Sequence, residues 1–100
     1  MGVYTHQLEE DVHCPNHLGK IVCVGRNYAD HAKELNNPIP KQPLLFIKPE
    51  TAAVPMSAPF AIPSNFGACQ HELEMAVLIG SDISGVTAAQ AKDAIAGVGL

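Results

Sequence analysis

Proline is the residue that most constrains this chain, because seven of its eight prolines fall between Pro38 and Pro63. Proline lacks a backbone N–H and its ring clashes with the preceding helical turn, so a helix cannot run through this stretch. Any strand here must be short or lie at a sheet edge. The run LLFIKP, residues 44–49, is the best candidate for such a strand.

Regular elements are expected before that stretch. KIVCVG, residues 20–25, is apolar and β-branched and ends at a glycine, which predicts a buried strand and its exit turn. A strand, a turn and a helix in this order could also form a phosphate loop, but the glycine spacing of such a loop is missing. NYADHAKEL, residues 27–35, predicts a short helix that begins at Asn27 and is stopped by NNP, residues 36–38.

After the prolines, the sequence predicts a loop over residues 61–70, a strand over residues 72–80 and a turn over residues 81–85. Both faces of the strand become apolar along its length. This pattern predicts burial on both sides, except at the start of the strand.

The clearest helix signal is TAAQAKDAIAG, residues 87–97. Thr87 and Gln90 form a capping-box pattern, and Gly97 is a suitable end. One face of this helix is expected to pack, because apolar residues recur at helical spacing at Ala88, Ala91, Ala94 and Ile95. VGL then begins a further strand at the end of the chain, which suggests a fragment of a larger domain. The pattern as a whole predicts an α+β fold.

Composition and charge exclude several classes of partner. The 100 residues are 47% apolar and 16% charged, as in a soluble globular chain. On folding, a chain of this size is expected to bury about two-thirds of the surface that its unfolded form exposes. A net charge of −4, with six scattered Lys and Arg, argues against nucleic acid as a partner. No apolar run is long enough to cross a membrane and the N-terminus lacks the features of a secretory signal, so we expect a cytoplasmic protein.

The three cysteines, Cys14, Cys23 and Cys69, are odd in number and show no CxxC spacing, which predicts free thiols in a reducing compartment. Cys14 also lies between His13 and His17, a grouping that could bind a soft metal. Zinc normally takes four ligands, and no second cluster supplies the others. Free thiols are therefore the preferred interpretation.

Glu72 and Glu74 stand at the mouth of the predicted strand 72–80. Side chains alternate along a strand, so both carboxylates are expected on one face. At about 6 to 7 Å and an effective dielectric of about 20, they would repel by roughly 2 to 3 kcal/mol. A cation between them would reverse that sign, and carboxylate oxygens suit Mg²⁺ or Mn²⁺ better than zinc. On spacing alone, a solvated strand end is preferred and a cation site is the alternative.

His31 and Glu34 are three residues apart on the predicted helix, so they share a face. The Glu34 carboxylate can accept a hydrogen bond from one ring nitrogen of His31 and leave the other nitrogen basic and outward. This is the geometry of an oriented general base. A solvated surface pair is the simpler interpretation of the same spacing.

Four blocks, taken in order, resemble the fumarylacetoacetate hydrolase family in its short prokaryotic and mitochondrial branch: IVCVGRNYADHAKEL, PLLFIKP, AIPSNFGACQHELEMAVLIG and AIAGVGL. The resemblance implies that residues 20–100 are the N-terminal part of the family's catalytic domain, preceded by a segment 1–19. It also implies that family's mixed β-roll with short peripheral helices, here incomplete, and a homodimer.

The resemblance further implies the site. Glu72 and Glu74 correspond to glutamates that bind a catalytic Mg²⁺ or Mn²⁺. The family's third metal carboxylate, an Asp, would fall just beyond Leu100. His71, in the same motif, is expected to pack rather than to bind the metal.

His31 and Glu34 correspond to the family's catalytic pair, and Lys48 to a lysine that lines the substrate pocket. The implied activity is metal-dependent cleavage of a C–C bond in an acylpyruvate-type 2-oxo acid, with His31 activating the attacking water. Oxaloacetate decarboxylation and isomerisation of a 2-oxo acid are the alternatives within the family. An inactive fragment and a metal-binding module stay open as alternatives of another class, although the second leaves His31 and Glu34 unexplained.

Overall fold

The computed structural model describes residues 4–9, 14, 17–28, 34–36 and 41–100. The chain forms two compact units. The first unit contains Met1–His6 and His17–Ala58, and the second contains Gln7–Asn16 and Pro59–Leu100. The polypeptide therefore passes from the first unit to the second and back within its first 17 residues.

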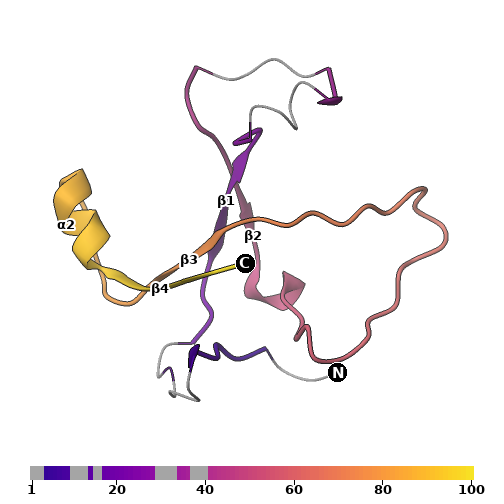
Figure 1. Cartoon of the computed structure of the whole chain (residues 1–100), viewed down its shortest axis with the longest axis horizontal. Helices are drawn as coiled ribbons and strands as arrows, with labels where there is room; N and C mark the ends of the chain where they lie inside the picture. The colour runs from indigo at the N-terminus through magenta and orange to yellow at the C-terminus, as the bar shows by residue number, and fades with distance from the viewer. Residues whose placement is uncertain (1–3, 10–13, 15–16, 29–33, 37–40) are drawn as a thin grey trace. The chain divides into compact units, whose positions relative to one another are not determined.

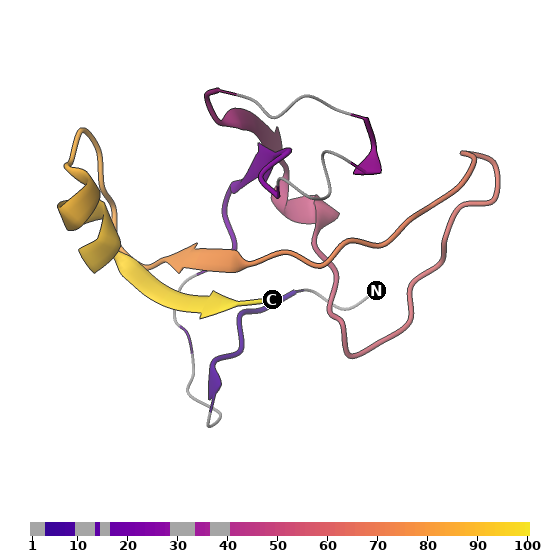
Figure 2. The same ribbon diagram turned by 45° about the horizontal axis from the view of Figure 1, so that its top comes forward.

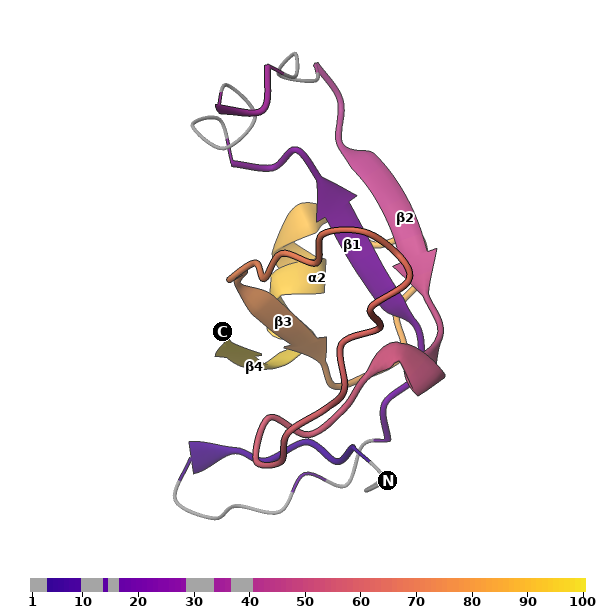
Figure 3. The same cartoon turned by 90° about the vertical axis from the view of Figure 1, so that its right-hand side faces the viewer.

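The first unit is built on an antiparallel pair of strands, β1 (Ile21–Gly25) and β2 (Leu44–Lys48), which run side by side (Figures 1 and 3). The pairing runs without interruption from Ile21 opposite Lys48 to Gly25 opposite Leu44. Valine, isoleucine, leucine and phenylalanine dominate both strands, as a pleated surface favours. Both strands are confirmed, and β2 fits between Pro43 and Pro49. The predicted burial of β1 is wrong, because Val22 is 59% exposed and the strand alternates between exposed and half-buried residues.

The remainder of the first unit is short and irregular. After β2 comes one turn of 3₁₀-helix, η2 (Glu50–Ala52), in which the Ala52 N–H donates to the Pro49 carbonyl at 3.0 Å. This single turn fits between two prolines. Of the predicted helix 27–35, residues 29–33 lie outside the described residues. Glu34 is helical, and Asn36 has φ = 60°, a left-handed conformation that is common where helices end. The rest of the predicted stop, residues 37 and 38, lies outside the described residues.

The second unit contains β3 (Ala76–Ile79), α2 (Ala88–Asp93) and β4 (Ile95–Gly99). β3 and β4 are antiparallel neighbours, and α2 lies in the connection between them (Figure 2). Their register is broken between Leu78 and Ile79, where β4 carries an extra residue. The predicted loop 61–70 and turn 81–85 both lack regular structure, as expected.

The predicted capping box at the start of α2 is confirmed. The Gln90 N–H donates to Thr87 Oγ1 at 3.2 Å, and the Thr87 N–H donates to Gln90 Oε1 at 3.0 Å. The predicted helix end at Gly97 is wrong, because the chain leaves the helix at Ala94 and continues as β4. The Gly80 N–H donates to the Ala94 carbonyl at 2.8 Å, so strand pairing begins as soon as the helix ends.

The strand predicted over residues 72–80 is shorter than expected, because only Ala76–Ile79 are in β3. Its predicted burial on both faces is wrong as well. Val77 and Ile79 are 49% and 47% exposed, and Leu78 is half-buried. In the described part of the chain, β3 pairs with β4 alone, in a two-stranded sheet.

Part of the N-terminal segment packs in the second unit. A Cβ built on Gly97 would lie 3.2 Å from Cδ2 of Leu8, so the bare backbone of β4 makes room for this leucine. The buried apolar residues among those described are Cys14, at 8% exposed, and Ala94, at 7%, both in this unit. The small core of the second unit therefore includes residues from the N-terminal segment.

Apolar surface is unusually accessible. Among the described residues, the large apolar side chains of Ile47, Met56 and Phe66 are 64%, 92% and 80% exposed. The cysteines Cys14, Cys23 and Cys69 are free thiols, as predicted. Among the described residues, no helix has the length and apolar character needed to span a membrane.

Candidate functional site

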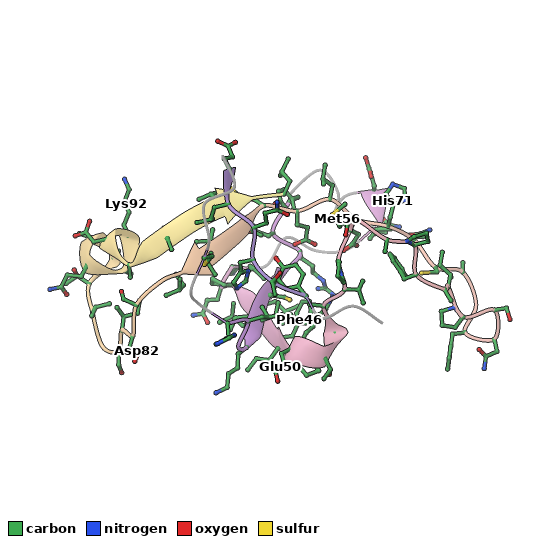
Figure 4. The ribbon with its side chains drawn as sticks, turned by 90° about the horizontal axis from the view of Figure 1, so that it is seen from below. Phe46, Glu50, Met56, His71, Asp82 and Lys92 are labelled. Carbon is green, nitrogen blue, oxygen red and sulfur yellow. The ribbon has the colours of Figure 1, made fainter. Side chains whose placement is uncertain are left out.

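The motif glutamates lie in the chain that leads into β3. Glu72 and Glu74 precede Ala76, the first residue of the strand, and are exposed together with His71, which Figure 4 labels. The sequence placed them on the strand itself, whereas the structure places them just before it. The pairing of Ala76 with Gly99 on β4 fixes the point from which this segment extends.

The donor set of this segment suits a hard divalent cation. Glu72 and Glu74 offer carboxylate oxygens that solvent can reach. Mg²⁺ is commonly held by one or two carboxylates and completes its shell with water and substrate oxygens. The described residues contain no group of three or more His, Cys, Asp or Glu side chains that could enclose an ion. The two glutamates therefore fit part of an open site rather than a closed protein cage.

The proposed catalytic pair is described in part. His31 lies outside the described residues, and Glu34 is an exposed helical residue of the first unit. Lys48 is the last residue of β2 and is opposite Ile21, the first residue of β1. The segment that contains His31 and Glu34 leaves β1 from its other end, after Gly25. Four steps along the strand, or about 13 Å, separate the two ends of the ladder, so the backbone of Lys48 is remote from that exit.

Sequence reasoning missed Arg26. This exposed residue follows Gly25 directly and has φ = 52°, a left-handed conformation that residues with a Cβ rarely adopt. The sequence pointed to Gly25 as the turn residue, but Gly25 remains paired with Leu44 in the ladder. No sequence signal assigns the left-handed conformation to an arginine that has a glycine beside it.

The chain matches a family model described as "Fumarylacetoacetate (FAA) hydrolase C-terminal" over residues 20–100. It is 51% identical over 83 residues to the oxaloacetate tautomerase YcgM of Escherichia coli strain K12. The aligned residues make up 83% of this chain and 38% of that protein. It is 46% identical over 80 residues to the mitochondrial oxaloacetate tautomerase FAHD1 of Bos taurus. The aligned residues make up 80% of this chain and 36% of that protein.

A solved structure is also similar. A crystal structure from Oleispira antarctica, described as a fumarylacetoacetate isomerase/hydrolase, is 52% identical with a TM-score of 0.85, and the match covers 95% of this chain and 42% of that one. The chain thus spans about two-fifths of the length of the relatives that it matches. Because the family model covers 81 of the 100 residues, the chain belongs to the fumarylacetoacetate hydrolase family.

Proposed function

We propose that the intact protein is an oxaloacetate tautomerase that uses a divalent cation bound by Glu72 and Glu74. The observation that carries this proposal is the identity of 51% over 83 residues to a relative named for that activity. The sequence pattern favoured acylpyruvate hydrolysis and kept isomerisation as an alternative. The names of the similar proteins support the alternative better.

Tautomerisation moves one proton between C3 of oxaloacetate and the oxygen on C2, and it breaks no carbon–carbon bond. The intermediate on this path is an enolate, whose negative charge is costly without an electrophile. A bound Mg²⁺ or Mn²⁺ would supply that electrophilic stabilisation. Glu72 and Glu74 would hold the cation where the chain enters β3, with the remaining ligand positions open to substrate.

The proton transfer is assigned to His31 and Glu34. His31 would take the proton from C3 as a general base and return it to the C2 oxygen as the conjugate acid. Glu34 would accept a hydrogen bond from the second ring nitrogen and so fix the tautomer of the imidazole. Lys48 remains a candidate for substrate binding, since its ammonium would attract an anionic 2-oxo acid.

The test compares three reactions of the intact protein with Mg²⁺: loss of the ultraviolet absorbance of enol-oxaloacetate, release of CO₂, and hydrolysis of acetylpyruvate. We expect tautomerisation above the uncatalysed rate to be the fastest. His31→Ala should lower it by about two to four orders of magnitude, the range for a lost general base. His17→Ala is the matched control, because His17 is exposed and is not assigned to the site.

Two results would contradict this function. If acetylpyruvate hydrolysis were the fastest reaction and depended on His31, the hydrolase interpretation would hold instead. If His31→Ala and His17→Ala left tautomerisation equally fast, the proposed proton transfer would be wrong.

A further inference from the structure

We propose that Leu8 is a positioning residue for the cation site, because its packing against β4 holds the strand pair from which Glu72 and Glu74 extend. The inference rests on the proposed function, since it assigns a further residue to the same metal site. Leu8 precedes the region that matches the family, which begins at residue 20. The inference is carried by one close approach, by the exposure of the strand residues and by the register of the hairpin.

Leu8 approaches β4 at a residue that has no side chain. A Cβ built on Gly97 would lie 3.2 Å from Cδ2 of Leu8, closer than an ordinary van der Waals contact. Leu8 itself is half-buried. Both residues belong to the second unit, so the approach is internal to that unit. The leucine side chain therefore occupies space that a side chain at position 97 would need.

Burial in the hairpin is concentrated at one pair of opposite residues. Leu78 in β3 and Gly97 in β4 are half-buried, whereas the other residues of both strands are exposed. Leu78 and Gly97 are ladder partners, and the side chains of directly opposite residues lie on the same face of an antiparallel pair. Leu8 lies in the Cβ direction of Gly97, so it packs on the face that carries the Leu78 side chain.

This pair lies between a break in the ladder and the motif glutamates. The register is irregular between Leu78 and Ile79, on the side away from the glutamates. On the other side two further pairs follow in the described part of the chain, and the last of them is Ala76 with Gly99 (Figure 2). The glutamates precede Ala76 by two and four residues. Their point of origin therefore depends on three regular pairs, and the leucine packs on the first.

So short a ladder needs apolar packing on one face. A two-stranded hairpin alone is at best marginally stable in water, and a buried leucine supplies part of the missing stabilisation. Without that packing the start of β3 would fray, and a cation would have to order the glutamates when it binds. The free energy of this ordering is subtracted from the free energy of binding, so the affinity for the cation falls.

The experiment measures Mn²⁺ binding to the intact protein by electron paramagnetic resonance without substrate. Leu8→Ala should weaken binding by about 3- to 10-fold, the range for ordering one or two side chains. Leu8→Met should restore most of the affinity, because methionine has nearly the volume of leucine. Leu45→Ala is the matched control: it removes the same side chain from β2 in the first unit, where Leu45 is 60% exposed, and should bind like the parent.

A general loss of stability predicts a different pattern, which hydrogen exchange of the metal-free protein separates. In Leu8→Ala the amides of residues 76–79 should exchange faster, while those of residues 44–48 keep the parental rate. General destabilisation would accelerate exchange in both strand pairs. If Leu8→Ala did not fold, Leu8→Val would give the same comparison with a smaller loss, because it removes less of the side chain.

Three results would overturn the inference: parental Mn²⁺ affinity in the folded alanine variant, a loss that Leu8→Met or Leu45→Ala shares in full, or equally faster exchange in both strand pairs. Glu72→Gln in the same series separates this inference from the proposed function. If Glu72→Gln weakened binding and Leu8→Ala did not, only the role of Leu8 would be wrong. Parental affinity in Glu72→Gln would contradict the metal site and this inference together.

Discussion

Each strand pair contains a glycine whose missing Cβ leaves room for a leucine, but the two leucines come from different parts of the chain. A Cβ on Gly25 would lie 3.2 Å from Cδ2 of Leu44, which is the ladder partner of that glycine. A Cβ on Gly97 would lie 3.2 Å from Cδ2 of Leu8, which precedes the region that matches the family. The close contact is local to the strand pair in the first unit and long-range in the second.

The difference teaches where each unit obtains its packing. The register of β1 and β2 already accounts for the contact of Gly25, and Leu44 is 50% exposed, so its side chain can move aside. The close contact of β4, in contrast, is with Leu8, which lies 89 positions before Gly97 in the sequence. We therefore expect the second unit, which contains Glu72 and Glu74, to depend on the N-terminal segment.

The largest effect that tests this contrast is expected from Gly97→Val. The added Cβ would lie 3.2 Å from Cδ2 of Leu8, less than an ordinary contact distance, and the two methyl groups add further volume. Overpacking of this kind costs about 1 to 3 kcal/mol. Urea unfolding of the intact protein measures it. Leu8→Ala in the same chain should restore part of the loss, and strictly additive effects of the two substitutions would show that they do not touch.

A smaller effect is expected from Thr87→Ala in the same unit. The substitution removes the hydroxyl that accepts from the Gln90 N–H at 3.2 Å, and the loss of such a cap costs about 1 kcal/mol. Gln90→Ala removes the reciprocal bond and should cost less. If Thr87→Ala destabilised the protein more than Gly97→Val, local capping would outweigh the long-range contact, and the contrast would be broken.

The smallest effect is expected from Gly25→Ala in the first unit. The new Cβ meets the end of an exposed leucine side chain that can rotate away, so the free energy of unfolding should change by less than about 0.5 kcal/mol. Chemical denaturation beside Gly97→Ala gives the comparison. A loss for Gly25→Ala that exceeded the loss for Gly97→Ala would reverse the proposed difference.

The sequence predicted those parts of the fold that depend on neighbouring residues. β1, β2 and the capping box at Thr87 follow from β-branched runs, flanking prolines and a three-residue spacing, which are local signals. The end of α2 could not be predicted from local signals, because Ala94 and Ile95 suit a helix as well as a strand. The pairing of β4 with β3 decided between them.

The candidate site was predictable to a different degree. The spacing of Glu72 and Glu74 favoured a solvated strand end, and only the resemblance to a family assigned them to a cation. The left-handed turn at Arg26 could not be predicted, because Gly25 beside it is the residue that such a turn normally selects. The residue types at positions 25 and 26 therefore do not indicate which of the two residues adopts the left-handed conformation.

The most direct test of the account is Mn²⁺ binding to the intact protein, followed by electron paramagnetic resonance without substrate. The variants are Glu72→Gln and Glu74→Gln, and the matched control is Glu50→Gln, an exposed glutamate of η2 in the first unit. If the two motif glutamates hold the cation, each motif variant should lose affinity by about tenfold or more while the control binds like the parent. Parental affinity in either motif variant would contradict the assignment of the metal site.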